Sequence, residues 1–377
     1  MKHDRSTRCV HAGTIHDPAS RGVNSPIYTS TAYEFIDAED TVYPRYLNTP
    51  NEKSVAAKLA ALEEAEGALV FSSGMAAIST VIFALLKQGD HIVFQKGLYG
   101  GTLHFIENEL PRFGIGYTIA TSQEVDDIMA AVNKNTRMIY LETPSNPLLK
   151  ITDLAGIADK AREKGILTVT DNTFASPVNQ QPIRQGMDMV IHSATKYLGG
   201  HSDICAGAVA TRNELLEKIL QTGRDFGGSL NALTLHLLER SMKTLDVRMQ
   251  RINSNAQAIA EFLVIHPAVE RVNYPGLPEH PGHKLAAGQM YGFSGMLSFE
   301  LKEMDPLAFQ KKLQLITPAI SLGGVESLVS SPSHTSHRYL GPEGRKRDGI
   351  AEGLIRFSTG IESQADLIED LGNALDN

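Results

Sequence analysis

The sequence "MDMVIHSATKYLGGHSD", residues 187–203, joins a short apolar segment to a lysine that has small neighbours. The apolar residues at 187–191 predict a buried strand, and Lys196 follows it between Thr195 and the pair Gly199–Gly200. A lysine after a buried strand normally extends its ammonium group into water. The serine, threonine and glycines around this lysine instead indicate a shaped pocket at the end of the strand.

Similar short apolar segments recur along the first two thirds of the chain. They are residues 68–71, 91–94, 137–142, 167–171 and 189–193. Helical segments such as 51–67, 75–89 and 154–164 lie between most of them, and Gly67 is expected to end the first of these helices. Strands that alternate with helices predict an α/β fold, with a mostly parallel sheet covered by helices on both faces.

The two ends of the chain have different patterns. Frequent prolines near the N-terminus predict an extended arm over residues 1–46, because proline breaks long helices. The parallel sheet then occupies residues 47–240. After a largely helical stretch, apolar segments at 295–301 and 353–359 predict a smaller C-terminal α/β domain over residues 241–377.

Composition narrows the class of protein. The chain has 377 residues, 42% hydrophobic residues and a formal net charge of −8, which argues against nucleic acid as the main partner. Its two cysteines, Cys9 and Cys205, are too few for a disulfide framework. The polar N-terminus and the absence of a long apolar stretch argue against a signal peptide and a membrane span. We therefore expect a cytoplasmic protein.

Three polar groups are predicted at the ends of strands, where open parallel sheets bind ligands. Ser72-Ser73-Gly74 precedes a helix and offers backbone N–H groups to a phosphate, although taken alone it reads better as a simple N-cap. Asp171 ends a strand, where a lone aspartate is commonly a turn residue, and Lys196 follows another strand. Together, a phosphate cradle, a carboxylate and a lysine are the parts needed to hold pyridoxal phosphate.

Longer stretches of the sequence resemble the pyridoxal-phosphate enzymes of cysteine and methionine metabolism, the family of cystathionine γ-lyase, cystathionine γ-synthase and methionine γ-lyase. The resemblance covers almost the whole chain. It is carried in order by "FSSGMAAI", "LYGGT", "ETPSNP", "TVTDNTFASP", "HSATKYLGGHSD", "SLGGVESL" and "LIRFSTGIE". It implies pyridoxal 5′-phosphate as cofactor and the aspartate-aminotransferase-like fold of type I, with a seven-stranded sheet in the larger domain.

The resemblance also implies a role for each matching residue. Lys196 forms the covalent link to the cofactor and moves protons, and Asp171 pairs with the ring nitrogen. Tyr99 stacks on the ring and is a catalytic acid or base for the leaving group. The phosphate is bound by Gly74, Met75, Ser193 and Thr195. Asn146 lies near the ring hydroxyl and the substrate, Arg356 binds the substrate carboxylate, and Ser321 orients the lysine and the substrate.

Two further matches concern the subunit arrangement and the substrate. Tyr43 and Arg45 match a segment that reaches the cofactor phosphate of a neighbouring subunit, which implies a homotetramer built from two dimers that share active sites. A loop arginine with surface contacts is the alternative reading of Arg45. Glu326 matches an acidic position that meets the distal ammonium of cystathionine, with a solvated loop carboxylate as the alternative. Gly101 stands where methionine γ-lyases carry a cysteine.

Other classes of protein fit less well. Residues 193–196 match the S-x-x-K motif of penicillin-recognising serine enzymes, but the partner motif K-T-G is absent from the sequence. No G-x-G-x-x-G lies between a first strand and a helix, as a nicotinamide enzyme requires. The pairs His280–His283 and His334–His337 lack the spacing of a helical zinc motif, so no metal is expected. A non-catalytic protein with this fold is a further alternative. It would lack the visible absorption band of the bound cofactor, so an absorption spectrum distinguishes it from an enzyme.

The expected reaction is that of a carbon–sulfur lyase acting on a sulfur amino acid. We favour α,γ-elimination of L-cystathionine, with β-elimination as a second activity. Cystathionine γ-synthase is the alternative, followed by methionine γ-lyase and O-acetylhomoserine sulfhydrylase. The loops "YPRYLNTPN" and "VSSPSHTSHRYL" depart from the family pattern.

Overall fold

The computed structural model describes residues 3–376. Within them, the larger sheet comprises β1 (Gly67–Phe71), β2 (His91–Phe94), β3 (Gly116–Ile119), β4 (Thr136–Glu142), β5 (Leu167–Asp171), β6 (Met189–His192) and β7 (Gly207–Thr211). The strand order is β1-β7-β6-β5-β4-β2-β3, and β6, β5, β4, β2 and β3 are parallel to their neighbours in that run. Only β7 runs antiparallel to both of its neighbours. The predicted mostly parallel sheet is confirmed.

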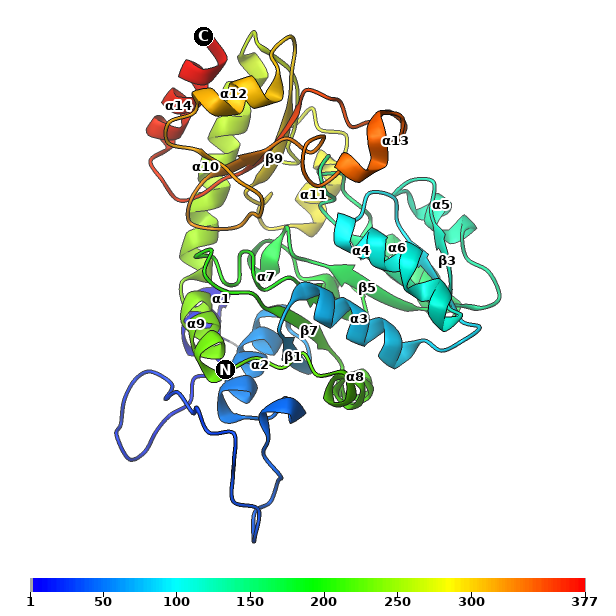
Figure 1. Ribbon diagram of the computed structural model, residues 1–377, viewed down its shortest axis with the longest axis vertical. Helices are drawn as coiled ribbons and strands as arrows, with labels where there is room; N and C mark the ends of the chain where they lie inside the picture. Colours follow the sequence, from blue (N-terminus) through cyan, green and yellow to red (C-terminus); the bar gives the residue numbers. More distant parts are fainter. Residues whose placement is uncertain (1–2, 377) are drawn as a thin grey trace.

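Helices cover both faces of this sheet (Figure 1). They are α2 (Pro50–Glu63), α3 (Gly74–Leu85), α4 (Gly100–Asn108), α5 (Val125–Ala130), α6 (Leu154–Glu163), α7 (Ser176–Asn179), α8 (Asn213–Phe226) and α9 (Ala232–Met242). α3, α4 and α8 pack on one face, where alternate strand residues such as Phe71 and Phe94 are fully buried. α2, α5, α6 and α9 pack on the other face. Strands with two covered faces explain the nearly continuous apolar segments in the sequence.

The second domain contains a smaller sheet of β8 (Val269–Asn273), β9 (Met296–Leu301), β10 (Thr317–Pro318), β11 (Leu328–Ser330) and β12 (Leu354–Ser358). Its order is β10-β11-β12-β9-β8, with antiparallel pairing except between β10 and β11. The surrounding helices are α10 (Leu245–Ile265), α11 (His283–Gln289), α12 (Pro306–Lys312), α13 (Gly341–Arg347) and α14 (Gln364–Asp376). The predicted boundary at residue 240 falls near the end of α9, and the division into 1–46, 47–240 and 241–377 stays a prediction.

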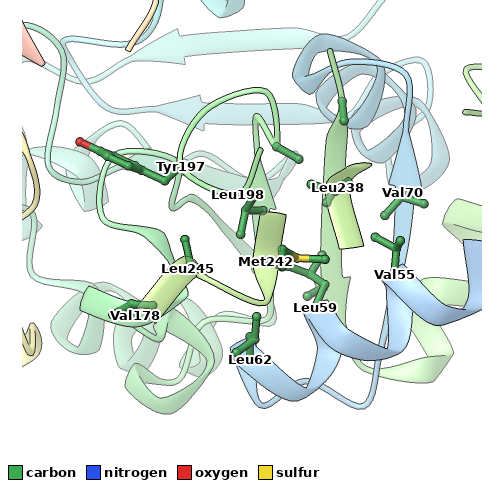
Figure 2. Close-up of a cluster of buried hydrophobic side chains, with 14 of the residues drawn as sticks. Val55, Leu59, Leu62, Val70, Val178, Tyr197, Leu198, Leu238, Met242 and Leu245 are labelled. Atoms are coloured by element: carbon green, nitrogen blue, oxygen red, sulfur yellow. The ribbon is translucent and has the colours of Figure 1, made fainter. Parts of the chain in front are cut away.

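One hydrophobic cluster continues from the larger sheet domain into the second domain. Figure 2 shows part of it, with Leu59 of α2, Leu238 and Met242 of α9, and Tyr197 and Leu198 beyond β6. The same cluster includes Met296 of β9 and Leu322 in the second domain. Because the packing is continuous, the loop that carries Lys196 is held between the two domains.

The structure corrects two expectations about the N-terminal region. The helix expected over 51–67 is α2, which ends at Glu63 because Glu64 takes a left-handed conformation with φ of 57°; Gly67 instead begins β1. The arm is not extended throughout, since Arg5–His11 forms helix α1. α1 packs against α2 and buries Cys9 completely, a tertiary contact that local sequence does not reveal.

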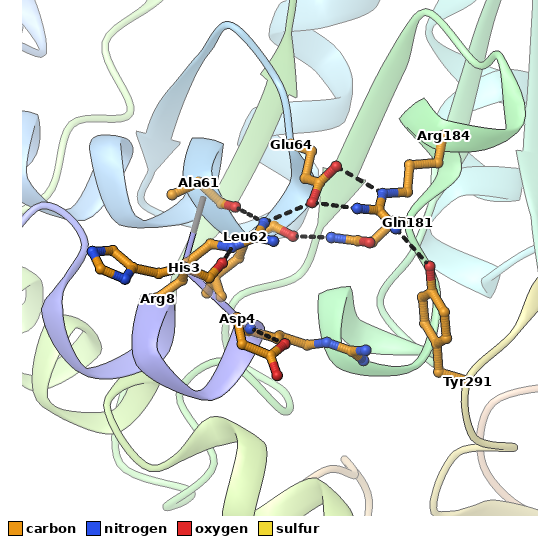
Figure 3. A network of polar contacts seen from close by, with 10 residues as sticks. His3, Asp4, Arg8, Ala61, Leu62, Glu64, Gln181, Arg184 and Tyr291 are labelled. Carbon is orange, nitrogen blue, oxygen red and sulfur yellow. Dashed lines mark hydrogen bonds and ion pairs between the residues drawn. The ribbon is translucent and has the colours of Figure 1, made fainter. Parts of the chain in front are cut away.

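A polar network joins α1, the end of α2 and the segment that contains Arg184 (Figure 3). The Glu64 carboxylate accepts hydrogen bonds from Arg8 at 2.8 Å and from Arg184 at 2.6 and 2.7 Å. Arg184 lies in the 3-10 helix Pro182–Gln185 and also donates to the hydroxyl of Tyr291 at 2.9 Å. Arg184 therefore makes the two-point contact with a carboxylate that its planar guanidinium favours.

This network predicts a pH-dependent loss of stability in Glu64→Gln. Hydrogen bonds from Arg184 and then Arg8 lower the pKa of Glu64 from 4.5 to about 2. A lowered pKa contributes stability above about pH 4.5 that is lost as the pH falls towards 2. We expect denaturant unfolding to show a loss on the order of 1 kcal/mol at pH 7, which shrinks towards pH 3. Glu217→Gln, on an exposed part of α8, is the control, and a pH-independent loss in Glu64→Gln would contradict the prediction.

Candidate active site

The carboxyl ends of β4, β5 and β6 lie side by side and end in Glu142, Asp171 and His192. Asp171 is buried, with 7% of its surface exposed. Its carboxylate accepts hydrogen bonds from the backbone N–H of Thr173 at 3.0 Å and from the hydroxyl of Tyr140 at 3.3 Å. Burial raises the pKa of Asp171, while these hydrogen bonds act in the opposite direction. The result is a buried acid with a fixed orientation, suited to a cationic ring nitrogen.

Lys196 lies in the loop after β6, where its Nζ donates a hydrogen bond to Ser321 Oγ at 2.7 Å. Ser321 has a φ of 88°, a left-handed conformation that aims its side chain at the lysine from the second domain. The next turn approaches closely, because a Cβ on Gly323 would lie 2.8 Å from the backbone nitrogen of Tyr197. Burial, and then the charge of Arg356, lower the pKa of Lys196. A neutral amine can act as a nucleophile or a base.

Arg356 of β12 is buried beside the same serine. Its Nη2 donates to the backbone oxygen of Ser321 at 3.1 Å, and its Nη1 donates to Asn146 Oδ1 at 3.3 Å. Burial lowers the pKa of Arg356 to about 10, so the guanidinium remains charged at neutral pH. Among residues 3–376, neither Arg356 nor Lys196 has a carboxylate within 4 Å as an ion-pair partner. Because a buried cation is costly without an anion, this cluster fits an anionic ligand.

A second anion site lies at the N-terminus of α3. Ser73 caps the helix, and Gly74 and Met75 are its first two residues. The N–H groups at the start of a helix have no acceptor within the helix, so they can donate to a ligand. A Cβ on Gly74 would lie 2.9 Å from the Cβ of Ser193, so only glycine allows the helix to approach this close. Partial positive charge at a helix N-terminus beside serine and threonine hydroxyls fits a phosphate group. The Thr195 hydroxyl also contacts the main chain of Ala206.

Tyr99 precedes α4, and about half of its side chain is exposed. Its backbone N–H donates to Glu142 Oε2 at 2.8 Å. Sequence reasoning singled out neither Glu142 nor Tyr140. Glu142 lies within "ETPSNP" at a predicted strand end, and that position was the only available signal.

Three of the predicted residues make their contacts elsewhere. The Arg45 guanidinium donates to the backbone oxygen of Arg224 at the end of α8 and lies 5.3 Å from the centre of the Tyr46 ring. Tyr43 is partly exposed beside it. Glu326 is exposed and accepts a long hydrogen bond from Ser202 Oγ at 3.4 Å. The proposed cofactor and substrate contacts of these three residues therefore stay predictions.

The unusual loop at 331–340 closes one side of a cavity of about 510 Å³. His337, Tyr339 and Asn146 are among the residues that line it. His337 is buried, and burial followed by the charge of Arg356 lowers its pKa to about 4. The loop therefore presents a neutral imidazole on the side of the site where Asn146 contacts Arg356.

Comparison with known proteins identifies the family. The model of the Cys/Met metabolism PLP-dependent enzymes matches residues 6–376. The chain is 44% identical to cystathionine γ-lyase of Bacillus subtilis (strain 168), covering 99% of each chain. It is 43% identical to cystathionine γ-synthase of Mycobacterium bovis, covering 98% of this chain and 96% of that protein. The crystal structure of cystathionine γ-lyase from Lactobacillus plantarum complexed with L-serine covers 99% of both chains, with a TM-score of 0.95 and 40% identity.

These findings confirm the family, the fold and the cofactor that the sequence implies. The buried acid, the lysine, the guanidinium and the helix N-terminus provide groups suited to a ring nitrogen, an aldehyde, a carboxylate and a phosphate, respectively. The chain belongs to the Cys/Met metabolism PLP-dependent enzymes, with the type I fold of these enzymes and pyridoxal 5′-phosphate as its cofactor.

Proposed function

We propose that this enzyme is a cystathionine γ-lyase. It would cleave the Cγ–S bond of L-cystathionine, consume one water and release cysteine, 2-oxobutanoate and ammonia, with β-elimination as a second activity. The partly buried cluster of Lys196, Ser321, Arg356 and Asn146 carries the proposal, because it combines a nucleophilic amine with a site for an amino-acid carboxylate. The name of the Bacillus subtilis relative supports the substrate.

Lys196 is the proposed catalytic residue. Its lowered pKa favours the neutral amine, which would hold the cofactor through its aldehyde and would take the proton from the substrate Cα. When bound, pyridoxal phosphate supplies an electron sink for the negative charge that develops there. Ser321 holds Nζ in place. The flexible lysine stem reaches Cβ as well as Cα, so the same amine serves both β- and γ-elimination.

The other predicted residues orient the two small molecules. Asp171 pairs with the ring nitrogen, and Tyr99 covers the ring. The N–H groups of Gly74 and Met75 and the hydroxyls of Ser193 and Thr195 would donate hydrogen bonds to the phosphate. Asn146 lies beside the ring hydroxyl.

Arg356 binds the α-carboxylate of the substrate. Two of its nitrogens already contact Ser321 and Asn146, which fix the plane of the guanidinium. A fixed planar donor matches the two oxygens of a carboxylate. Every candidate substrate carries this carboxylate, so Arg356 selects amino acids without choosing among the reactions.

Two residues support cystathionine as the substrate. Glu326 is exposed in the same loop as Ser321, where it can meet the distal ammonium of cystathionine. A Cβ on Gly101 would lie 2.5 Å from Cε1 of Tyr99, so a cysteine there would displace the ring from its present position. This argues against the arrangement of methionine γ-lyases.

Cystathionine γ-synthase is the second candidate, supported by the Mycobacterium bovis relative. That enzyme class joins cysteine to an activated homoserine and releases no keto acid in its synthetic reaction. Methionine γ-lyase and O-acetylhomoserine sulfhydrylase are less favoured.

We also propose a cytoplasmic homotetramer in which Tyr43 and Arg45 reach the cofactor phosphate of a neighbouring subunit. Within the described residues, no helix is long and apolar enough to cross a membrane. Val23, Phe35 and Ile36 of the N-terminal arm are 96%, 73% and 77% exposed in the single chain. Large exposed apolar side chains favour a covering partner, and a second copy of the chain supplies one.

The keto acid tests the reaction. With L-cystathionine alone, the purified holoenzyme should release 2-oxobutanoate in an equimolar amount to cysteine. Chromatography of the derivatised keto acids separates 2-oxobutanoate from pyruvate. Pyruvate as the main product would indicate β-cleavage, and no keto acid would favour the synthase. Methionine, and O-acetylhomoserine with sulfide, belong in the same assay.

Arg356→Lys tests the carboxylate site. Lysine keeps the charge but loses the two-point contact, so we expect KM for L-cystathionine to rise by about 10-fold or more. The visible absorption of the bound cofactor should stay unchanged, because Arg356 is assigned to the substrate. Arg137→Lys, at an exposed arginine, is the control. An unchanged KM would show that another group binds the carboxylate.

A further inference from the structure

Glu142 is a buried acid in the motif "ETPSNP", and the proposed elimination reaction assigns it no role. It ends β4, with 4% of its surface exposed, and lies in the register position opposite Asp171 of β5. Paired residues on parallel neighbours point to the same face of a sheet. Glu142 and Asp171 are therefore neighbouring carboxyl groups on the face covered by α3 and α4.

The segment 95–99, which ends in Tyr99, is attached to the last residues of β4 at three points. The backbone N–H of Gln95 donates to the oxygen of Tyr140 at 3.2 Å, and the Gln95 side chain donates to the backbone oxygen of Glu142 at 2.5 Å. The Glu142 side chain then accepts the N–H of Tyr99 at 2.8 Å. Of these contacts, only the last bears directly on Tyr99.

The same end of β4 also contacts Asp171. The Tyr140 hydroxyl donates to Asp171 Oδ2, and Tyr140 is fully buried. Burial and then the charge of Asp171 raise the pKa of Glu142. Tyr140 and Glu142, two residues apart on one face, thus connect the acid at the ring nitrogen with the residue assigned to the ring face.

We propose that Glu142 is a positioning residue that holds Tyr99 over the cofactor by accepting its backbone N–H. The inference rests on the proposed place of Tyr99 at the ring. In this proposal, the position of Tyr99 depends on the length of the Glu142 side chain and not on its charge. Glu142 acts through Tyr99 and also accepts the backbone N–H of Asn146, but it touches neither substrate nor cofactor in this account.

Two variants separate length from charge. Glu142→Gln keeps the reach and an acceptor oxygen but removes the charge, whereas Glu142→Asp keeps the acid but withdraws it from Tyr99 by one methylene. Hydrogen exchange followed by mass spectrometry on the full chain, with and without pyridoxal phosphate, reports on the N–H of Tyr99. We expect exchange in the peptide containing Tyr99 to be about 10-fold or more faster in Glu142→Asp and within about 3-fold of wild type in Glu142→Gln.

Kinetics and the circular dichroism of the bound cofactor provide further readouts. Glu142→Asp should weaken the visible dichroic band and lower kcat for L-cystathionine by about 10- to 100-fold, with KM within about 3-fold. Glu142→Gln should largely restore both. Glu163→Gln, at an exposed position of α6, is the matched control for loss of an acid.

The reverse order of the two variants, equal damage in both, or wild-type behaviour in both would overturn the proposal. If Glu142→Asp fails to fold, rapid exchange at Tyr99 in Glu142→Gln would still overturn it. Exchange in the cofactor-free chain does not depend on the sulfur substrate. A failure here is thus distinguishable from a failure of the keto-acid assay, which concerns the reaction.

Discussion

The amine of Lys196 and the guanidinium of Arg356 are held together around Ser321, and the active site depends on this arrangement. Both side chains are largely withdrawn from water, and this burial lowers the pKa of each. Neutral oxygens of Ser321 and Asn146 contact them, which satisfies hydrogen bonds without neutralising charge. An anion that enters this cluster gains from the charged guanidinium of Arg356, whose geometry matches an amino-acid carboxylate.

The cluster exists because two domains pack against each other. Lys196 comes from the loop after β6, whereas Ser321 and Arg356 come from the second domain. The shared hydrophobic cluster around Tyr197 and Leu322 holds these parts at a fixed distance. Close approaches at Gly74 and Gly323 bring the helix N-terminus and the serine loop against the lysine segment. In a fold of this kind, packing holds the catalytic side chains in one conformation.

Sequence predicted the parts of the structure that local patterns specify. Apolar segments bounded by helices predicted the parallel sheet, and the lysine and the aspartate were predicted at strand ends. Helix α1 was missed because its burial depends on α2, and the end of α2 was misplaced because Glu64, not a glycine, adopts the left-handed conformation. Glu142 was missed because a carboxylate at a strand end resembles a turn residue until its partner, Tyr99, is seen. The reaction is not specified either, since the candidate substrates share the α-amino acid group and differ in their side chains.

The covalent attachment point is the most direct test of this account. Reduction of the holoenzyme with borohydride, followed by proteolysis and mass spectrometry, marks the lysine that carries the cofactor. The account predicts a pyridoxyl group on Lys196, in the peptide that contains "SATKYLGG". A modified lysine elsewhere in the chain, or none, would contradict it.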